Sequence, residues 1–278
     1  MNANELTRLL TPAYGAGEAR AIVRMVMEER FGLTLTDLLL GKDTTLSADE
    51  RKDFEKIAQR LAECEPVQHV LGFAPFCGHR FKVTPDVLIP RPETEELVRL
   101  ACEIQPSAQT VLDLCTGSGC IAISLAKAMP EAEVMGVDVS SEALAVAQEN
   151  ASALEAENVR FFHCNVLDWE PPLGQRFDLL VSNPPYVRES EAADMSAHVL
   201  NHEPHLALFV PDADPLLFYR AIARIGLMAL HDDGHLALEI NAALHSETRH
   251  VFLEAGYADV EIHQDQLARP RILTAQRP

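Results

Sequence analysis

An apolar segment that leads into a turn of small residues, and then into a helical pattern, most strongly constrains the fold of this chain. Val111–Leu114 is apolar except for Asp113, and Cys115-Thr116-Gly117-Ser118-Gly119 follows it. Apolar residues then recur from Ile121 to Ala128 with the 3.6-residue period of an α-helix. This order is typical of the first unit of a doubly wound α/β domain, where a nucleoside cofactor approaches bare backbone. The turn alone is a weak signal, because many nucleotide-binding proteins share it.

A second predicted strand ends in an acidic residue and supports this interpretation. Glu133–Asp138 is followed by Ser140, which can cap a helix over Ser141–Ala151. Asp138 lies about 25 residues beyond Asp113, close to the spacing at which a carboxylate binds a ribose diol. The alternative is that Asp138 only caps the helix after it. The order of strand, turn, helix, strand and acid favours a nucleoside site, formed by Asp113, Cys115, Thr116, Gly117, Ser118, Gly119 and Asp138.

The loop after a third predicted strand contains an acid beside an aromatic residue. Val159–Leu167 predicts the strand, and Asp168 and Trp169 lie beyond it. Trp169 is the only tryptophan in the chain. In such a fold an adenine ring lies near this loop, so Asp168 can bond the adenine amine and Trp169 can stack on the ring. The alternative is that Trp169 seals the edge of the sheet.

A stiff turn with acceptors and few donors follows a fourth predicted strand. Phe177–Ser182 predicts a buried strand that ends at Asn183-Pro184-Pro185-Tyr186, because proline cannot extend the ladder of hydrogen bonds. Asn183 offers a side-chain oxygen and Pro184 a carbonyl, neither proline has an N–H, and Tyr186 adds a flat aromatic face. This set suits a planar NH2 group, either a side-chain amide or a nucleobase amine. The alternative is a proline-rich surface turn. Because the strand order reverses between the first and fourth strands, we expect their turns to converge on one pocket.

Together, these motifs resemble a known class of enzymes. Asp113–Gly119, Asp138 and Asn183–Tyr186 are similar to class I methyltransferases, which use S-adenosylmethionine to methylate amide or exocyclic amine nitrogens. Over nearly its whole length the chain resembles the release-factor glutamine N5-methyltransferases, the HemK/PrmC family. The most specific segment is Ile89-Pro90-Arg91-Pro92-Glu93-Thr94-Glu95. Other matching segments are Glu65–Gly72, Val87–Val98, His202–Leu208 and Leu238–Ile240.

The resemblance implies an α/β fold, with a doubly wound, Rossmann-like, seven-stranded methyltransferase domain after a small N-terminal helical bundle and a β-hairpin linker. It implies methylation of the amide nitrogen (N5) of the glutamine in the Gly-Gly-Gln motif of peptide chain release factors. The implied catalytic residues are Asn183, Pro184 and Tyr186, and these bind the substrate together with Pro185. S-adenosylmethionine is implied at Asp113, Cys115, Thr116, Gly117, Ser118, Gly119, Asp138, Asp168, Trp169 and Asn183.

Four positions depart from the family pattern. Cys115 stands where the family usually has the first glycine of its turn, and it is small enough to leave cofactor binding expected. His69 replaces a common tyrosine, while Asn241 and Ala268 replace glycines. We expect these last three residues to lie away from the reaction centre.

Periodicity divides the chain into three regions. Residues 1–75 show helical periodicity, as in Glu18–Arg30 and Ala48–Glu63, and are expected to form a helical domain that docks the substrate. Residues 76–90 are expected to form a β-hairpin linker, because Phe73–Pro90 alternates and contains three prolines. Residues 91–278 are expected to form the methyltransferase domain. By resemblance, it closes with an antiparallel hairpin between Val260–His263 and Arg271–Thr274.

Composition excludes some classes of protein. No apolar run is long enough to span a bilayer, and Met1–Leu6 does not resemble a signal peptide, so we expect no membrane association. The six cysteines form no CxxC pair, which favours reduced thiols and a cytoplasmic location. A net charge of −19 argues against a wide duplex-DNA footprint and stable nucleic-acid binding.

The chain is expected to be a monomer. The spacing of His198, His202, Glu203 and His205 matches no zinc pattern, so no metal is expected.

Two other functions remain open from the sequence. The first is an adenine or other nucleobase N-methyltransferase, which would share the Asn183–Tyr186 chemistry but normally needs a basic groove and base-flipping elements. The second is a catalytically silent S-adenosylmethionine-binding module that serves as a partner or scaffold. The intact set of acceptors from Asn183 to Tyr186 argues against a silent module.

Overall fold

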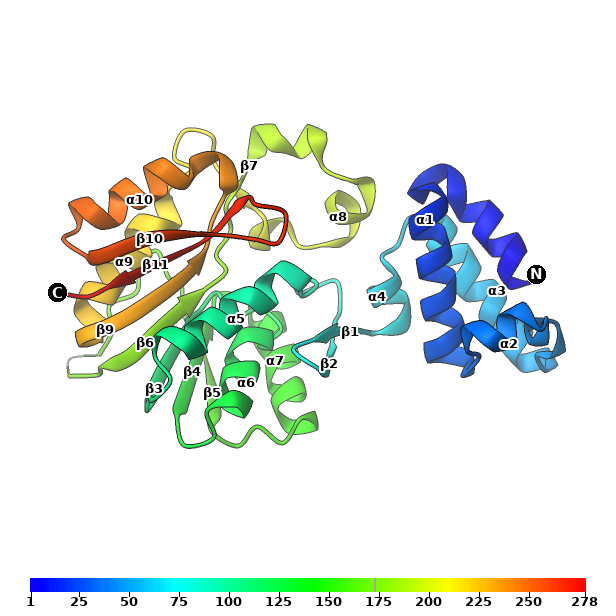
Figure 1. Cartoon of the computed structure of the whole chain (residues 1–278), viewed down its shortest axis with the longest axis horizontal. Coiled ribbons are helices and arrows are strands. Elements are labelled where there is room, and N and C mark those ends of the chain that lie inside the picture. The colour runs from blue at the N-terminus through cyan, green and yellow to red at the C-terminus, as the bar shows by residue number, and fades with distance from the viewer. Residues whose placement is uncertain (173) are drawn as a thin grey trace. The chain divides into compact units, whose positions relative to one another are not determined.

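The computed structural model describes residues 1–172 and 174–278, and they form two compact units (Figure 1). The smaller unit contains Met1–Phe73 together with Ser196–His202. The larger unit contains Ala74–Met195 and Glu203–Pro278. The division therefore falls close to the expected end of the helical region. However, a short segment from the second half of the chain joins the smaller unit, and no sequence pattern indicated this.

The smaller unit is entirely helical. Its longest helix, α1, is kinked at Gly15, where φ is 76°, three residues after Pro12. Thr34 and Ser47 cap the next two α-helices, each paired with an acid three residues later, and such caps contribute about 1 kcal/mol each. Tyr14 stacks on His198 with ring centroids 5.2 Å apart, which ties the late segment to this unit. The elements are α1 (Ala3–Phe31), α2 (Leu35–Leu39), η1 (Lys42–Thr45), α3 (Ala48–Ala62), α4 (Val67–Leu71) and α8 (Ala197–His202).

A mixed sheet of seven strands forms the centre of the larger unit. Its order is β10-β11-β9-β6-β3-β4-β5, and only β10 and β11 pair in antiparallel fashion with their neighbours. The order reverses between β3 and β6, so the predicted doubly wound, Rossmann-like sheet is confirmed, and the closing hairpin is present. The strands are β3 (Thr110–Leu114), β4 (Glu133–Asp138), β5 (Val159–His163), β6 (Phe177–Ser182), β9 (Leu230–Glu239), β10 (Ala258–Gln264) and β11 (Pro270–Gln276).

Helices cover both faces of this sheet because its central strands are apolar on both sides. In β6, Leu179 and Val181 join one buried cluster, whereas Leu180 between them joins the other. The first cluster contains residues of α5 (Pro92–Ile104), α6 (Cys120–Ala128) and α7 (Ser141–Ala153). The second contains residues of α9 (Leu217–Ala229) and α10 (His245–Glu254), and Figure 1 shows the two groups of helices on opposite sides of the sheet.

A hairpin packs on the core of the larger unit and spans residues 73–82, where residues 76–90 were expected. It consists of β1 (Phe73–Phe76) and β2 (His79–Lys82), paired as a separate two-stranded sheet. Phe76 and Phe81 are buried in the first core cluster. The Asn150 side chain on α7 accepts from the Lys82 N–H at 2.7 Å and donates to the Lys82 carbonyl at 3.1 Å. The hairpin therefore belongs almost entirely to the larger unit.

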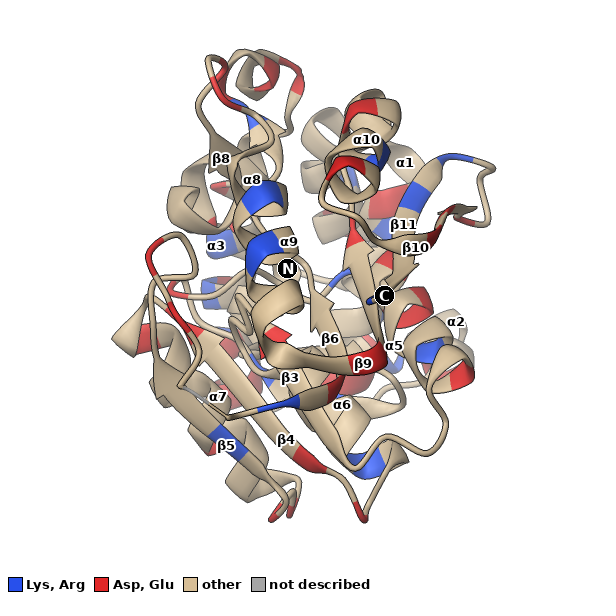
Figure 2. Ribbon diagram, turned by 90° about the vertical axis from the view of Figure 1, so that its left-hand side faces the viewer, with Lys and Arg blue, Asp and Glu red and all other residues tan. Residues whose placement is uncertain are grey.

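A long insertion follows β6. Its ends, β7 (Val187–Arg188) and β8 (Phe209–Val210), pair in parallel. Between them lie the 3-10 helices η2 (Glu189–Asp194) and η3 (His205–Ala207), with α8 separating the two. A fourth 3-10 helix, η4 (Ala242–Leu244), follows β9. In Figure 2 the Lys and Arg residues are scattered over many elements. None of the helices in the described part of the chain is long and apolar enough to cross a membrane.

Candidate active site

The carboxyl ends of β3, β4 and β6 meet at a cavity of about 250 Å³. Gly117 from the turn after β3, Asp138 from the end of β4 and Asn183 from the turn after β6 all line it. The predicted convergence of the two turns on one pocket is therefore confirmed. A smaller cavity of about 40 Å³ shares Cys115, Gly117 and Asn183 with the first and also reaches Thr94.

The turn after β3 presents bare backbone to the larger cavity. Gly117 has φ 54°, and a Cβ atom there would meet nothing within 4 Å, so the backbone is open to a ligand. Gly119 has φ 79°, and its Cβ would lie 3.0 Å from the side chains of Ala147, Ile123 and Phe161. Glycine is therefore required at 119 by both conformation and space.

Asp113 and Thr116 hold this turn from beneath. The Thr116 hydroxyl donates to Asp113 Oδ2 at 2.6 Å, and the Ala122 N–H donates to the same oxygen at 3.2 Å. Burial raises the pKa of Asp113 to about 7, although both hydrogen bonds act in the opposite direction. Asp113 Oδ1 is buried and accepts no hydrogen bond from the residues that the structure describes. Asp113 thus supports the turn and retains one free acceptor.

Asp138 connects the same turn to the helix after β4. Its Oδ2 accepts from the Gly117 N–H at 2.8 Å, and its Oδ1 accepts from the Ser140 N–H at 2.9 Å. The Ser140 hydroxyl accepts from the Ala143 N–H and caps α7, as predicted. Burial raises the pKa of Asp138, while these backbone donors lower it. Each oxygen keeps a second lone pair, and Asp138 lines the cavity, so the carboxylate can still accept from a diol.

The loop after β5 reaches the cavity through residues other than the two expected. Cys164, Asn165, Val166 and Leu167 line it, whereas Asp168 and Trp169 do not. Asp168 is exposed and accepts from Asn165 Nδ2 at 2.7 Å, and Trp169 packs against the core cluster that contains α9. Adenine contacts by Asp168 and Trp169 therefore stay predictions, and the apolar wall at this point comes from Val166 and Leu167.

The turn after β6 presents acceptors, as its sequence suggests. Asn183 is half-buried, and Pro184 and Pro185 are buried. Asn183 Nδ2 donates to the Thr94 hydroxyl at 3.3 Å. Within residues 1–172 and 174–278, no group donates to Asn183 Oδ1 or to the Pro184 carbonyl. Asn183 lines both cavities, whereas Pro184 and Tyr186 line neither of them, so the Pro184 carbonyl is an acceptor without a described donor beside the larger cavity.

A buried carboxylate at the end of β9 holds this turn. Glu239 is only 2% exposed, and its Oε1 accepts from the Tyr186 hydroxyl at 2.8 Å. Its Oε2 accepts from the Thr94 hydroxyl at 2.7 Å. Burial and the neighbouring Glu239 hold the pKa of the Tyr186 phenol well above its usual value, so this phenol is a donor. No role was predicted for Thr94 or Glu239, although both lie in segments that carry the resemblance.

Asn241 contacts the same turn, so the expectation that it lies away from the reaction centre is wrong. Its Nδ2 donates to the Tyr186 carbonyl at 3.0 Å and to Glu191 at 3.1 Å. Asn241 φ is −67°, so its backbone does not require glycine. Cys115 and Ala268 do occupy the left-handed region, with φ of 60° and 57°. Left-handed backbone favours glycine and costs other residues about 1–2 kcal/mol, which explains the family's preference at these two positions.

Glu203 fixes the segment before α5, and this segment forms another wall of the cavity. It accepts from the Ile89 N–H at 2.9 Å and from Arg91 Nη2 at 2.5 Å. Leu88 lines the cavity next to this anchor, and Leu206 and Phe218 line it too. None of these walls was predicted, since single apolar residues carry no signal of their own. In the described part of the chain, no cluster of His, Cys, Asp and Glu is suited to a metal ion.

The reversal of strand order, the glycine turn and the acid after the second strand define a class I methyltransferase. Family models agree: residues 97–208 match the methyltransferase small domain, and residues 4–72 match the PrmC N-terminal domain. A solved methyltransferase from Pyrococcus furiosus has the same fold, with a TM-score of 0.51 and 16% identity. That comparison covers 72% of this chain and 89% of the other.

Two bacterial relatives identify the particular family. The release factor glutamine methyltransferase of Bacteroides thetaiotaomicron is 45% identical over 268 residues, which cover 96% of each chain. That of Flavobacterium psychrophilum is 38% identical and covers 97% of this chain and 95% of its own. The chain therefore belongs to the release factor glutamine methyltransferase family, and it is an S-adenosylmethionine-dependent enzyme.

The residues of the larger cavity fit S-adenosylmethionine. The bare backbone at Gly117 leaves room for a ligand against the turn, and Asp138 offers acceptors to ribose hydroxyls. Val139, Val166 and Leu167 supply apolar surface for a nucleobase. The unpaired, buried Asp113 Oδ1 beneath the turn can accept from a cationic group or through a bound water.

Proposed function

We propose that this chain transfers a methyl group from S-adenosylmethionine to the side-chain amide nitrogen of the glutamine in the Gly-Gly-Gln motif of peptide chain release factors. The observation that carries this proposal is the pair of acceptors, Asn183 Oδ1 and the Pro184 carbonyl, to which no described residue donates. An NH2 group has two hydrogens for these two acceptors. The names of the relatives supply the substrate class.

The chemistry explains why acceptors are needed. An amide nitrogen is a poor nucleophile because its lone pair is delocalised into the carbonyl. Acceptance of both hydrogens by Asn183 and Pro184 orients the nitrogen and stabilises the positive charge that develops on it. Cofactor binding at the larger cavity supplies an electrophilic methyl group on a sulfonium. Such positioning contributes up to about 7–11 kcal/mol when the geometry is well aligned. No general base is assigned, because the proton leaves easily once nitrogen is cationic.

Tyr186 has a role as a rigid neighbour of this site. Its hydroxyl donates to Glu239 and its backbone carbonyl accepts from Asn241, so both the ring and the backbone of Tyr186 are held. A fixed ring can cover the plane of the substrate amide and exclude water. Pro185 lines the larger cavity beside Asn183 and completes the substrate-binding turn.

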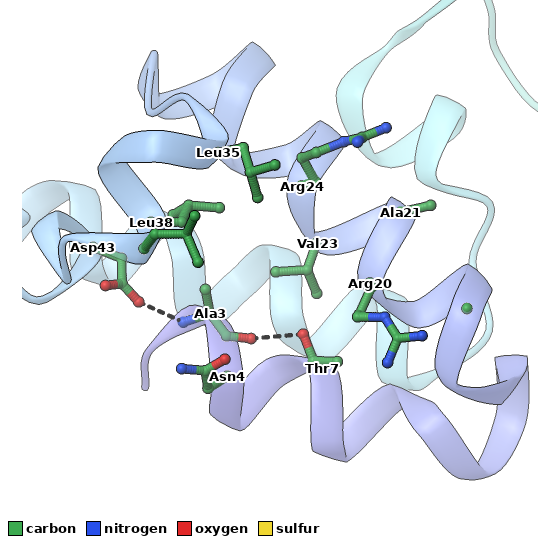
Figure 3. Close-up of a pocket in the computed structure, with 12 residues that line it drawn as sticks. Ala3, Asn4, Thr7, Arg20, Ala21, Val23, Arg24, Leu35, Leu38 and Asp43 are labelled. Atoms are coloured by element: carbon green, nitrogen blue, oxygen red, sulfur yellow. Dashed lines mark hydrogen bonds between the residues drawn. The ribbon is translucent and has the colours of Figure 1, made fainter.

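We propose further that the smaller unit docks the release factor. A cavity of about 530 Å³ lies between α1 and α2, and Leu35, Leu38, Arg20 and Arg24 line it (Figure 3). Leu35 is 52% exposed and Leu39, also in the lining, is 80% exposed. The two arginines are exposed one helical turn apart, and neither forms an ion pair among the described residues. Exposed leucines beside unpaired arginines fit an apolar protein surface with acidic neighbours.

A charge reversal tests the docking role. The Arg20→Glu/Arg24→Glu double variant should raise KM for the intact factor about tenfold or more and leave kcat largely unchanged, because the docking surface lies outside the chemistry. Arg8→Glu is the matched control, since Arg8 is an exposed arginine of the same helix outside this cavity. An unchanged KM in the double variant would exclude this cavity as the docking surface.

Transfer of labelled methyl groups tests the function itself. Purified chain should label a bacterial release factor, and a factor with Gly-Gly-Gln changed to Gly-Gly-Ala should stay unlabelled. Labelling of DNA instead of the factor would support a nucleobase methyltransferase. Cofactor binding without transfer to either would support a silent module.

The location is also proposed. All six cysteines are free thiols, which suits the reducing cytoplasm where translation termination occurs. The monomeric state and the lack of stable nucleic-acid binding stay predictions from the sequence.

A further inference from the structure

The Asn183 carboxamide can present either its oxygen or its NH2 group to a substrate. An asparagine side chain has a donor and an acceptor of nearly the same shape, so rotation by 180° exchanges them. Only one direction presents Oδ1 to a substrate NH2 group. The other presents an NH2 group, which would repel the substrate amide nitrogen and attract a carboxylate.

Two hydrogen bonds lead from Asn183 through Thr94 to a buried acid, Glu239, which also accepts from Tyr186. Tyr186 and Thr94 donate their hydroxyl hydrogens to the two oxygens of Glu239, at 2.8 and 2.7 Å. The Thr94 hydroxyl has then given its single hydrogen away, and only its lone pairs face Asn183. Asn183 must therefore turn its NH2 group toward Thr94, at 3.3 Å, and its oxygen the other way.

The surroundings keep these hydrogen bonds intact. Thr94 and Glu239 are both 2% exposed, so water does not compete for their hydrogen bonds. Thr94 lies in the first turn of α5, and its N–H is bonded to the Arg91 carbonyl at 3.0 Å, which holds the backbone in place. Glu239 lies at the end of β9, directly beside β6 in the sheet. Low exposure and fixed backbone make the hydrogen-bond direction a property of the fold.

We propose that Glu239, acting through the Thr94 hydroxyl, fixes the Asn183 carboxamide with its oxygen toward the substrate, so that the site selects an amide over a carboxylate. Thr94 and Glu239 are positioning residues, since they act through Asn183. This inference rests on the proposed methylation of glutamine. It adds the residues that determine specificity for that side chain over the isosteric glutamate.

Glu239→Gln is the sharpest variant because it changes hydrogen-bond direction with little change in shape. The only hydrogen-bond partner of the Tyr186 hydroxyl among the described residues is Glu239, so the new amide oxygen should face Tyr186. Its NH2 group then donates to Thr94, and the Thr94 hydrogen turns toward Asn183. Asn183 should respond by presenting its own NH2 group to the substrate.

The test compares two release factors, one with Gly-Gly-Gln as substrate and one with Gly-Gly-Glu as competitive inhibitor. In wild-type enzyme the glutamine factor should bind far better than the glutamate factor. In Glu239→Gln this ratio should fall at least about tenfold and kcat about a hundredfold, while cofactor affinity measured by calorimetry stays unchanged. A purely structural role would weaken both factors alike and leave the ratio unchanged.

Two substitutions at Thr94 make the result independent of how Glu239→Gln folds. Thr94→Val removes the hydroxyl with little change in shape, so Asn183 can adopt either direction and the ratio should fall. Thr94→Ser keeps the hydroxyl and should restore most of the discrimination. A wild-type ratio in Thr94→Val, or in folded Glu239→Gln, would overturn the inference. Failure of wild-type enzyme to methylate the glutamine factor would instead overturn the proposed function.

Discussion

The turns after β3 and β6 lie at the carboxyl ends of adjacent parallel strands, yet they are built in opposite ways. Between Cys115 and Gly119, left-handed backbone at three positions exposes the main chain to the cavity. Between Asn183 and Tyr186, two prolines remove backbone donors, and side chains from α5 and β9 hold the turn. Left-handed backbone shapes the first turn, and Asp138 from the adjacent strand also holds it, whereas the second turn is held by side chains much farther away along the chain.

This difference matches the two ligands. A cofactor with hydroxyl groups and a flat base suits exposed backbone, one carboxylate and an apolar wall. A planar NH2 group suits two acceptors with no competing donor. Damage to the first turn should therefore reduce cofactor binding, while damage to the second should reduce methyl transfer with the cofactor still bound.

Asn183→Ala should give the largest difference between its effect on methyl transfer and its effect on cofactor binding. The variant removes one of the two acceptors, so the substrate nitrogen is no longer oriented, and loss of a comparable contact lowers rates by about 10²–10³. Cofactor affinity should change much less. Single-turnover rates with saturating cofactor measure the first effect, and calorimetry measures the second.

Asn183→Asp is the informative control for this variant. Aspartate keeps an acceptor toward the substrate, so it should be less damaging than alanine. It loses the donor toward Thr94 and places a charge near Glu239, so it should remain slower than wild type. Aspartate as inactive as alanine would contradict acceptance as the essential role of Asn183.

Asp138→Asn should have the opposite effect, with a larger loss of cofactor affinity than of methyl-transfer rate. Loss of the charged contact to a ribose should weaken S-adenosylmethionine binding about tenfold, with a smaller effect on single-turnover rate at saturation. Asparagine is preferable to alanine because its one oxygen can still accept from either Ser140 or Gly117, whereas alanine loses both bonds and disturbs the turn more. Unchanged affinity in the folded variant would exclude the ribose contact.

A smaller effect is expected from Asn241→Gly, which restores the residue usual in the family. Loss of the hydrogen bond to the Tyr186 carbonyl, worth about 1 kcal/mol, should loosen the second turn and lower kcat a few-fold. Cofactor affinity should not change. A kcat equal to that of wild type would mean that this contact does not position Tyr186.

A separate effect, on stability rather than on activity, concerns the pH dependence that Asp113 produces. Burial raises its folded pKa to about 7, above the value of 3.8 expected in the unfolded chain. Between about pH 4 and 7 the folded state therefore holds more protons, and this group lowers stability as pH rises, with no further loss above pH 7. Asp113→Asn lacks this penalty, so the Tm of the variant minus that of wild type should increase from pH 5 to pH 8. A constant difference would contradict ionisation of Asp113 in this range.

The first turn could be predicted from sequence because its glycines and the acid at the end of the next strand follow a known spacing. The strand over Glu133–Asp138, the Ser140 cap and the Gly117 and Gly119 turn all appear as expected. The hydrogen bonds of the second turn join residues 89, 145 and 55 positions apart, namely Asn183 with Thr94, Thr94 with Glu239, and Asn241 with Tyr186. Periodicity and spacing contain no information about such pairs.

Two other features show the same limit. No local signal marks Ser196–His202 as part of the smaller unit, since Tyr14, on which His198 stacks, lies 184 positions earlier in the chain. Trp169 lies in the loop where it was predicted. However, Leu167, two residues earlier, lines the cavity and Trp169 does not. A change in Trp169 fluorescence on cofactor binding would show that it senses the site, and no change would leave it as a residue of the core edge.

The most direct test of the account is a structure of the enzyme with S-adenosylhomocysteine and an unmethylated Gly-Gly-Gln peptide. One terminal atom of the glutamine amide should lie within about 2.7–3.2 Å of both Asn183 Oδ1 and the Pro184 carbonyl. That atom must be the nitrogen, because both neighbours are acceptors. A glutamine whose amide contacts neither acceptor, or whose oxygen faces an Asn183 NH2 group, would contradict the account.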